Sequence, residues 1–488
     1  MRVFIAVIVS ASSIALLATA RAAPAPPLPA PEVAGGPIGT GGPLVVEGWA
    51  PDRRWVALCQ AREDTDGDGE IAVHLGYHGD TFGDALAPYI VVGDGPGQRV
   101  DAYLGASADG RWLAAVERGR LVLWDTATGG RRDLTALGAA EGPSSPLVPS
   151  WGGFEPGGAR YLFLAGEGAS RAAALVDPLT GDTTPVKHGA DALFAAFPLD
   201  GGRHAVVFTY PLGARPQLPR TSLAPGGCRG PITSYSTGGG PVNVARSVVG
   251  LDGKPAPDGA LVIRAGRALV REPGGDLVWV GADGARAPAL PVGVGGFVLR
   301  VGSGALLVAS PVGDHGEAEV IWVADDGRVA RTGLRRAAPS EDRAERADGV
   351  WSTWEGGRTW LVDMATGAHA LGPDEVDVLA AAGGNALVTR RRDGLAAVVA
   401  FGSGAVTELA ERVAPYAERG AAGSWAYAQL AGGGNVVVDV AAGKVAGVVG
   451  GPEAVAISAD GYLLAPTVEA TARGLAGGPL AWTRPARP

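Results

Sequence analysis

The chain has 488 residues, of which 78 are glycine and 47% are hydrophobic, and its formal net charge is −9. Disordered chains combine low hydrophobicity with high charge, so this composition excludes a largely disordered protein and predicts that the glycines form turns. The charges are spread along the sequence without a concentrated basic region, which excludes typical nucleic-acid binders and proteins that dock on anionic membranes.

The N-terminus has the features of a secretory signal peptide over residues 1–22. Met1-Arg2 precedes an apolar run from Val3 to Ala20, and Ala18-Thr19-Ala20 supplies small residues at cleavage spacing. An uncleaved anchor is the alternative, because about 18 apolar residues nearly span a bilayer. The cleavage options favour removal, and no membrane insertion is expected afterwards. We therefore expect a periplasmic or secreted protein with a Pro/Ala-rich spacer over residues 23–43.

The clearest repeat unit of the chain begins at Asp109-Gly110, a turn signal. Arg111 to Glu117 is expected to form a strand with Trp112, Ala114 and Val116 on one face, and Arg118-Gly119 reverses the chain. Leu121 to Trp124 is apolar throughout, as expected of a strand buried on both faces. Asp125 to Gly129 makes the next turn. Together with one strand before it and one after it, the unit predicts a four-stranded antiparallel sheet.

Looser copies of this unit recur along the chain. The Asp-x-x-Thr-Gly turn returns at Asp177–Gly181 and Asp363–Gly367, and in degenerate form at Asp439–Gly443. A period of about forty residues favours a β-propeller over a β-sandwich, which needs no fixed repeat. We predict an all-β fold with a single propeller of seven or eight four-stranded blades over residues 44–488. Two smaller propellers are the alternative, and an irregular insertion is expected near residues 211–250.

The units resemble those of WD40-like and TolB-like bacterial propellers. The resemblance is carried by SADGRWLAAV (107–116), LVLWDTATG (121–129), LVDPLTG (175–181) and LVDMATG (361–367). Trp124-Asp125 is an isolated match to the Trp-Asp pair of strict WD40 repeats, and the Gly-His pairs are missing. The resemblance implies a propeller fold and leaves the activity open, because propellers include both enzymes and scaffolds.

One loop of the first predicted blade has the pattern of a calcium ligand set. Alternate carboxylates in a curled backbone converge on one point, and hard oxygen ligands suit Ca²⁺. The expected metal ligands are Asp64, Asp66, Asp68 and the carbonyl of Glu70. Calcium loops of integrin-like propellers are similar. Ala72 and Leu75 occupy the ninth and twelfth places of the loop and offer no side-chain ligand. The coordination of the metal must therefore be completed by water or by a carboxylate such as Glu63, Asp80 or Asp84. An acidic, solvated hairpin turn is the alternative.

The two cysteines of the chain are Cys59, in a predicted strand, and Cys228, in the irregular insertion. After export they are candidates for a disulfide, and the alternative is one buried and one exposed thiol. His74 and His78 are interpreted as surface residues of a strand end. Trp351, Trp354 and Trp360 are interpreted as core or rim packing residues of one blade, and a binding patch is the alternative.

The sequence favours a non-enzymatic, exported binding or scaffold propeller with a protein partner that it does not identify. No catalytic or cofactor-binding residue is predicted, and the only cofactor expected is a structural Ca²⁺. The alternative is an extracellular propeller enzyme, of the lyase or dehydrogenase type, with a site in the central channel. The chain lacks Gly-x-Ser-x-Gly, the nucleophile signature of many serine hydrolases.

Overall fold

A computed structural model of the chain describes the residues that form the sheets and most of their turns. The described residues are 32–39, 44–65, 67, 71, 73–75, 81–135, 153–155, 157–165, 172–188, 191–199, 203–210, 245–250, 254, 256, 260–264, 266–281, 284–290, 292, 296–301, 304–312, 317–337, 349–355, 357–414, 419–451, 454–466 and 479–485. The predicted signal peptide lies outside them. Within them, no helix is long and apolar enough to cross a bilayer.

The described residues form ten antiparallel sheets of three or four strands, which we number blades 1 to 10 in chain order, and one separate hairpin. Blade 1 contains β2 (Leu44–Trp49), β3 (Trp55–Gln60), β6 (Ala87–Val92) and β7 (Gln98–Arg99). The hairpin of β4 (Val73–Leu75) and β5 (Thr81–Gly83) lies between β3 and β6 in the sequence.

Blades 2 to 5 follow in the order of the chain. Blade 2 contains β8 (Ala102–Ala106), β9 (Trp112–Glu117), β10 (Arg120–Asp125) and β11 (Arg131–Asp133). Blade 3 contains β12 (Gly153–Phe154), β13 (Tyr161–Ala165), β14 (Ala172–Val176) and β15 (Thr183–Val186). Blade 4 contains β16 (Ala192–Leu199), β17 (His204–Tyr210) and β18 (Ala245–Gly250). Blade 5 contains β19 (Ala260–Arg264), β20 (Arg267–Arg271), β21 (Leu277–Gly281) and β22 (Arg286–Ala289).

Blades 6 to 10 complete the chain. Blade 6 contains β23 (Phe297–Val301), β24 (Ala305–Val312), β25 (Glu317–Ala324) and β26 (Val329–Ala337), and blade 7 contains β27 (Val350–Glu355), β28 (Arg358–Asp363) and β29 (His369–Leu371). Blade 8 contains β30 (Val376–Ala382), β31 (Asn385–Arg390), β32 (Leu395–Ala400) and β33 (Val406–Arg412). Blade 9 contains β34 (Arg419–Ala422), β35 (Trp425–Gln429), β36 (Asn435–Asp439) and β37 (Lys444–Val449). Blade 10 contains β38 (Ala456–Ile457), β39 (Leu463–Pro466), β40 (Leu480–Arg484) and β1 (Glu32–Ile38).

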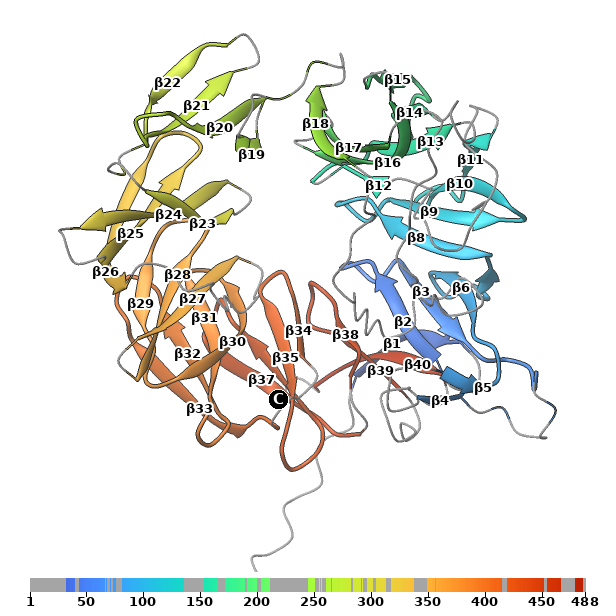
Figure 1. Cartoon of the computed structure of the whole chain (residues 1–488). Coiled ribbons are helices and arrows are strands. Elements are labelled where there is room, and N and C mark those ends of the chain that lie inside the picture. Colours follow the sequence, from blue (N-terminus) through green and yellow to red (C-terminus); the bar gives the residue numbers. More distant parts are fainter. Residues whose placement is uncertain are drawn as a thin grey trace, which may run out of the picture.

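The blades follow one another around a single circle (Figure 1). The circle is closed in blade 10, where β1 from the start of the chain pairs with β40 from its end, in the register Glu32↔Arg484 and Ile38↔Leu480. The prediction of an all-β propeller is confirmed. The predicted count of seven or eight blades is not confirmed, because the described residues form ten such sheets.

Two predicted boundaries also differ from the structure. The sequence predicts a spacer over residues 23–43, yet Glu32–Ile38 forms β1 and belongs to the ring. It predicts an irregular insertion that reaches residue 250, yet Ala245–Gly250 forms β18. Both strands acquire their structure by pairing with distant parts of the chain, which local sequence patterns do not report.

The core consists of apolar clusters between consecutive blades, and blade 2 shows how one sheet serves two of them. Leu113, Ala115, Val122 and Trp124 pack toward blade 1, while Trp112, Ala114, Leu121 and Leu123 pack toward blade 3. Successive strand residues point to opposite faces, so strict alternation assigns each side chain to one neighbour. Each fully buried large side chain contributes about 1.5–3 kcal/mol. The prediction that Leu121–Trp124 is buried on both faces is confirmed.

The repeated Asp-x-x-Thr-Gly turns have one local structure. In blades 2, 3 and 7 the glycine N–H donates to the carbonyl of the turn aspartate, at 2.8 Å in each case. The aspartate side chain accepts from the backbone N–H two residues later, as Asp177 Oδ1 does from Leu179 at 2.8 Å. The glycines have φ between +72° and +85°, a region that L-residues with a Cβ rarely adopt.

Several of these turns also tie one blade to the preceding blade. Arg132 Nε of blade 2 donates to the Pro178 carbonyl of blade 3 at 3.0 Å. Trp322 Nε1 of blade 6 donates to the Met364 carbonyl of blade 7 at 2.9 Å. Asn385 Nδ2 of blade 8 donates to the Val440 carbonyl of blade 9 at 3.0 Å. In each case the acceptor is the residue after the turn aspartate, so the turn fixes the position of one blade against the next.

Candidate functional site

The predicted calcium loop follows β3, as expected, and is described in part. Asp64 Oδ1 accepts from the Gly67 N–H at 2.6 Å. Thr65 donates through its N–H and its hydroxyl to Asp84 Oδ1, the latter at 3.1 Å, and its Oγ1 accepts from the Ala85 N–H at 2.7 Å. Asp84 is 4% exposed. This carboxylate, one of those considered for closing the metal site, therefore anchors the loop to the start of β6.

The remaining predicted ligands, Asp66, Asp68 and Glu70, lie outside the described residues, as do His78 and Asp80. Among the residues that are described, no group of three or more His, Cys, Asp or Glu side chains is arranged to hold a metal ion. Calcium binding by this loop therefore stays a prediction.

Cys59 lies in β3, is 1% exposed and is not a free thiol. It packs with Ala61 and Leu86 in a small cluster of blade 1. Cys228 lies outside the described residues. The bridge between these two cysteines stays a prediction.

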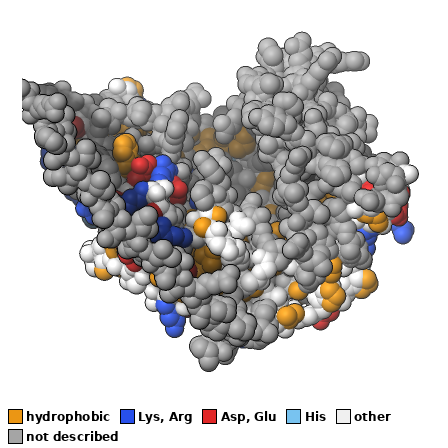
Figure 2. All heavy atoms as spheres, turned by 90° about the horizontal axis from the view of Figure 1, so that it is seen from below, with side chains coloured by type: hydrophobic (Ala, Val, Ile, Leu, Met, Phe, Trp, Pro, Cys, Tyr) orange, Lys and Arg blue, Asp and Glu red, His pale blue; other side chains and the backbone are white. Residues whose placement is uncertain are grey.

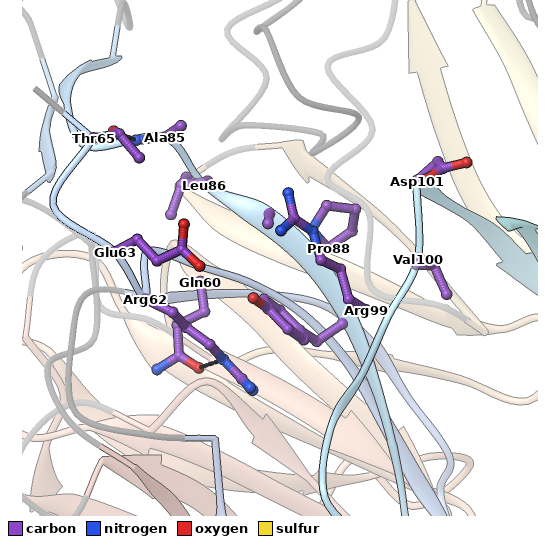
Figure 3. Close-up of a pocket in the computed structure, with 12 residues that line it drawn as sticks. Gln60, Arg62, Glu63, Thr65, Ala85, Leu86, Pro88, Arg99, Val100 and Asp101 are labelled. Atoms are coloured by element: carbon purple, nitrogen blue, oxygen red, sulfur yellow. Dashed lines mark hydrogen bonds between the residues drawn. The ribbon is translucent and has the colours of Figure 1, made fainter. Parts of the chain in front are cut away.

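Beside the loop, blade 1 carries a pocket of about 450 Å³, which we call the rim pocket (Figure 3). Leu86, Pro88 and Val100 supply apolar parts of its lining. Arg62 is held by two contacts: its Nε donates to Gln60 Oε1 at 3.0 Å, and its guanidinium lies 3.6 Å from the centre of the Tyr89 ring. Both contacts use groups of blade 1, so the position of Arg62 is fixed before any ligand binds.

A second hollow, of about 340 Å³, lies where the first strands of the sheets approach one another, and we call it the inner recess. Its lining comes from blades 1, 2 and 9 and consists of Gly48, Trp49, Pro51, Trp55, Tyr103, Ala106, Ala421, Ala422 and Gly423. Blade 10 lies between blades 9 and 1, and its first strand, β38, has only two residues.

The aromatic residues of the inner recess are held by specific contacts. Trp55 Nε1 donates to the Gly110 carbonyl at 2.7 Å, and Trp49 Nε1 donates to the Ile457 carbonyl at 3.1 Å. Tyr103 tilts toward Trp55, with ring centres 6.1 Å apart. A Cβ at Gly48 would lie 2.8 Å from Tyr103 Oη, so glycine is required for this approach. The recess therefore combines fixed rings with small residues.

Charged turns border the inner recess. Ser107-Ala-Asp-Gly110 and Ser458-Ala-Asp-Gly461 form the same turn, in which the serine hydroxyl donates to the aspartate at 2.6 Å. Between them, Arg53 of blade 1 forms an ion pair with Asp460 at 2.8 Å and lies 4.2 Å from the Tyr462 ring centre. The border is thus polar and internally paired, around an apolar hollow.

The three neighbouring tryptophans of blade 7 divide between the core and the surface. Trp351 is fully buried, and Trp360 packs at the edge of the cluster that joins blades 6 and 7. Trp354 is 59% exposed. The packing interpretation holds for Trp351 and Trp360 and is wrong for Trp354, which lies near the end of β27, where the chain turns at Gly357.

Antiparallel sheets arranged in a circle, closed by pairing of the first strand with the last, define a propeller. The chain has a β-propeller fold. No protein-family model matches the sequence, and no curated protein matches it.

The chain is similar to solved propeller structures, at low identity. It is 14% identical to apo AztD from Citrobacter koseri, covering 92% of this chain and 99% of that chain with a TM-score of 0.29. It is 16% identical to a putative TolB from Agrobacterium tumefaciens, covering 61% and 81% with a TM-score of 0.22. It is 11% identical to TolB from Acinetobacter baumannii, covering 59% and 53% with a TM-score of 0.23. The likeness to these structures concerns the fold alone.

Proposed function

We propose that this protein is an exported, non-enzymatic propeller that binds a protein partner at the inner recess. The observation that supports the proposal is the composition of the recess: ordered aromatic rings, small residues beside them and a border of paired charges. Binding energy at protein interfaces is concentrated where an anchoring side chain enters an apolar pocket that a polar rim surrounds. A hollow of about 340 Å³ has room for one large apolar side chain of a partner. Export is supported by the predicted signal peptide.

Binding of a partner from the exported fraction, compared between the wild-type protein and Ala421→Trp, tests this proposal. Ala421 lines the recess and is exposed, so an indole there fills the hollow without entering a cluster between blades. Ala442→Trp is the matched control, since it makes the same change at an exposed turn of the same blade. We expect Ala421→Trp alone to weaken binding, by about 2 kcal/mol or more. Substrate turnover by the wild-type protein that Ala421→Trp abolishes would instead show an enzyme with its site at the recess.

We further propose that the loop from Asp64 to Glu70 binds a structural Ca²⁺ through Asp64, Asp66, Asp68 and the Glu70 carbonyl. The support is the alternate spacing of the carboxylates and the anchoring of the loop by Asp84. Calcium would neutralise carboxylates that otherwise repel one another. Terbium luminescence and calorimetry of the whole protein test the site. A calcium response that is lost in Asp66→Asn supports it, and no response at millimolar calcium contradicts it.

We also propose that Cys59 and Cys228 form a disulfide in the exported protein. Cys59 is not a free thiol, and the sequence contains only one other cysteine; both observations support this pairing. Peptide mass spectrometry with and without reduction tests it. The bridged peptide pair is expected only before reduction, and alkylation of both cysteines without reductant would contradict the proposal.

A further inference from the structure

The rim pocket of blade 1 is lined by charged residues of both signs. Glu63, which follows β3, and Arg99, in β7, both line it and are both exposed. They approach the pocket from opposite sides (Figure 3). The apolar residues Leu86 and Pro88 also line it. A ligand that enters this space meets a carboxylate at one end and a guanidinium at the other.

Within the described residues, some charged side chains form ion pairs with one another. Arginine pairs with a carboxylate of the same blade at Arg111–Asp125, 2.8 Å, and at Arg390–Asp393, 2.9 Å. Figure 2 shows positive and negative side chains lying next to one another on the described surface. Within the described residues no ion pair involves Glu63 or Arg99.

The other charged groups of the pocket have fixed positions. Arg62 is held against Tyr89 and Gln60. Asp101 Oδ2 accepts from the Gly119 N–H at 2.7 Å. Among the described residues, no side-chain hydrogen bond or ion pair holds Glu63 or Arg99, so a ligand that presents a cation and an anion can contact both.

We propose that the rim pocket binds a short peptide with free termini, which carries a cation at one end and an anion at the other. Its ammonium group donates to Glu63, its carboxylate accepts from Arg99, and its aliphatic part lies on Leu86 and Pro88. The volume of about 450 Å³ lies in the range of small-molecule sites. Guanidinium and carboxylate form charge-assisted hydrogen bonds, which are the stronger class. The site is separate from the inner recess, and it does not depend on the binding function proposed for that recess.

Calorimetric titration of the whole protein with three related ligands tests the proposal. L-alanyl-L-alanine carries both charges, its N-acetyl derivative lacks the cation, and its C-terminal amide lacks the anion. We expect the free dipeptide to bind about tenfold or more tightly than either derivative, since each derivative loses one charge-assisted contact. Equal affinity for all three, or no heat with the free dipeptide at millimolar concentration, contradicts the proposal.

Two variants assign the ends of the ligand. Glu63→Gln should abolish the preference for the dipeptide over its N-acetyl derivative and retain the preference over the amide. Arg99→Gln should do the reverse. Both positions are exposed, so both variants are expected to unfold at the wild-type temperature. Arg328→Gln, at a 68% exposed side chain of blade 6, is the matched control and should bind like the wild type. A variant that weakens all three ligands equally would overturn the assignment.

Discussion

Replacing Gly367 by alanine tests whether the Asp-x-x-Thr-Gly turns hold neighbouring blades together. Gly367 ends the turn of blade 7 at φ +76°, and a Cβ there would lie 2.6 Å from the ring of Trp322 in blade 6. Trp322 is buried and donates to the Met364 carbonyl in the same turn. The methyl group must therefore displace a ring that forms part of the interface between two blades.

The expected loss of stability in Gly367→Ala has a backbone part and a packing part, and the same substitution at Gly129 separates them. Alanine at positive φ costs about 1–2 kcal/mol. Displacing the packed ring costs about 1–3 kcal/mol more, and loss of its hydrogen bond costs about 1 kcal/mol. Gly129 occupies the same place in the turn of blade 2, at φ +72°, and a Cβ there would meet nothing within 4 Å. Gly129→Ala therefore reports the backbone cost alone.

Urea unfolding of both variants, followed by tryptophan fluorescence, measures the difference. We expect Gly367→Ala to be less stable than Gly129→Ala by about 2 kcal/mol or more. Equal destabilisation by the two variants would refute the idea that the turn glycine serves the contact between blades.

Three further predictions concern charge and closure. The bidentate guanidinium of Arg111 lowers the pKa of Asp125 to about 2. This pKa lies below the value of about 3.9 for an unfolded chain, so the ion pair stabilises the fold fully above about pH 3.9. Its contribution to the free energy of unfolding is lost as the pH falls toward about 2. Asp125→Asn should therefore flatten the melting temperature against pH in this window, and an unchanged slope would argue against it. Arg390→Gln removes contacts at 2.9 Å to both Asp393 and Glu408. It should lower the melting temperature slightly, and by less at high salt, because salt screens ion pairs near the surface. Thermal melts at two ionic strengths measure this difference, and an equal loss at both would count against an ionic origin. Deleting Glu32–Ile38 removes the strand that pairs with β40. The deletion should lower the melting temperature and promote association of the protein through the exposed edge of β40, which size-exclusion chromatography would detect. A monomer with wild-type stability would show that β1 is dispensable.

Local patterns predict the blades well because each blade is built from short-range contacts. The alternation of Trp112 to Val116 and the apolar run of Leu121 to Trp124 both appear as predicted, since period-two alternation assigns side chains to faces directly. The Asp-x-x-Thr-Gly turns are recognisable because positive φ at glycine leaves a clear mark in the sequence. Repeats can be predicted from the sequence when short-range contacts determine their structure.

The recess and the ring closure are not predictable in this way. Trp49, Tyr103 and Ala421 lie in three different blades, and only the circular arrangement brings them together. The strand Glu32–Ile38 resembles a proline- and glycine-containing spacer and becomes ordered by pairing with residues from the end of the chain.

The most direct test of the proposed binding function is chemical cross-linking of the exported protein at the inner recess. A photo-reactive residue at position 421 is expected to capture one defined protein partner, and the same residue at position 442 is expected to capture none. Capture of the same partner with equal yield from both positions, or turnover of a small substrate at the recess without any captured protein, would contradict the proposed function.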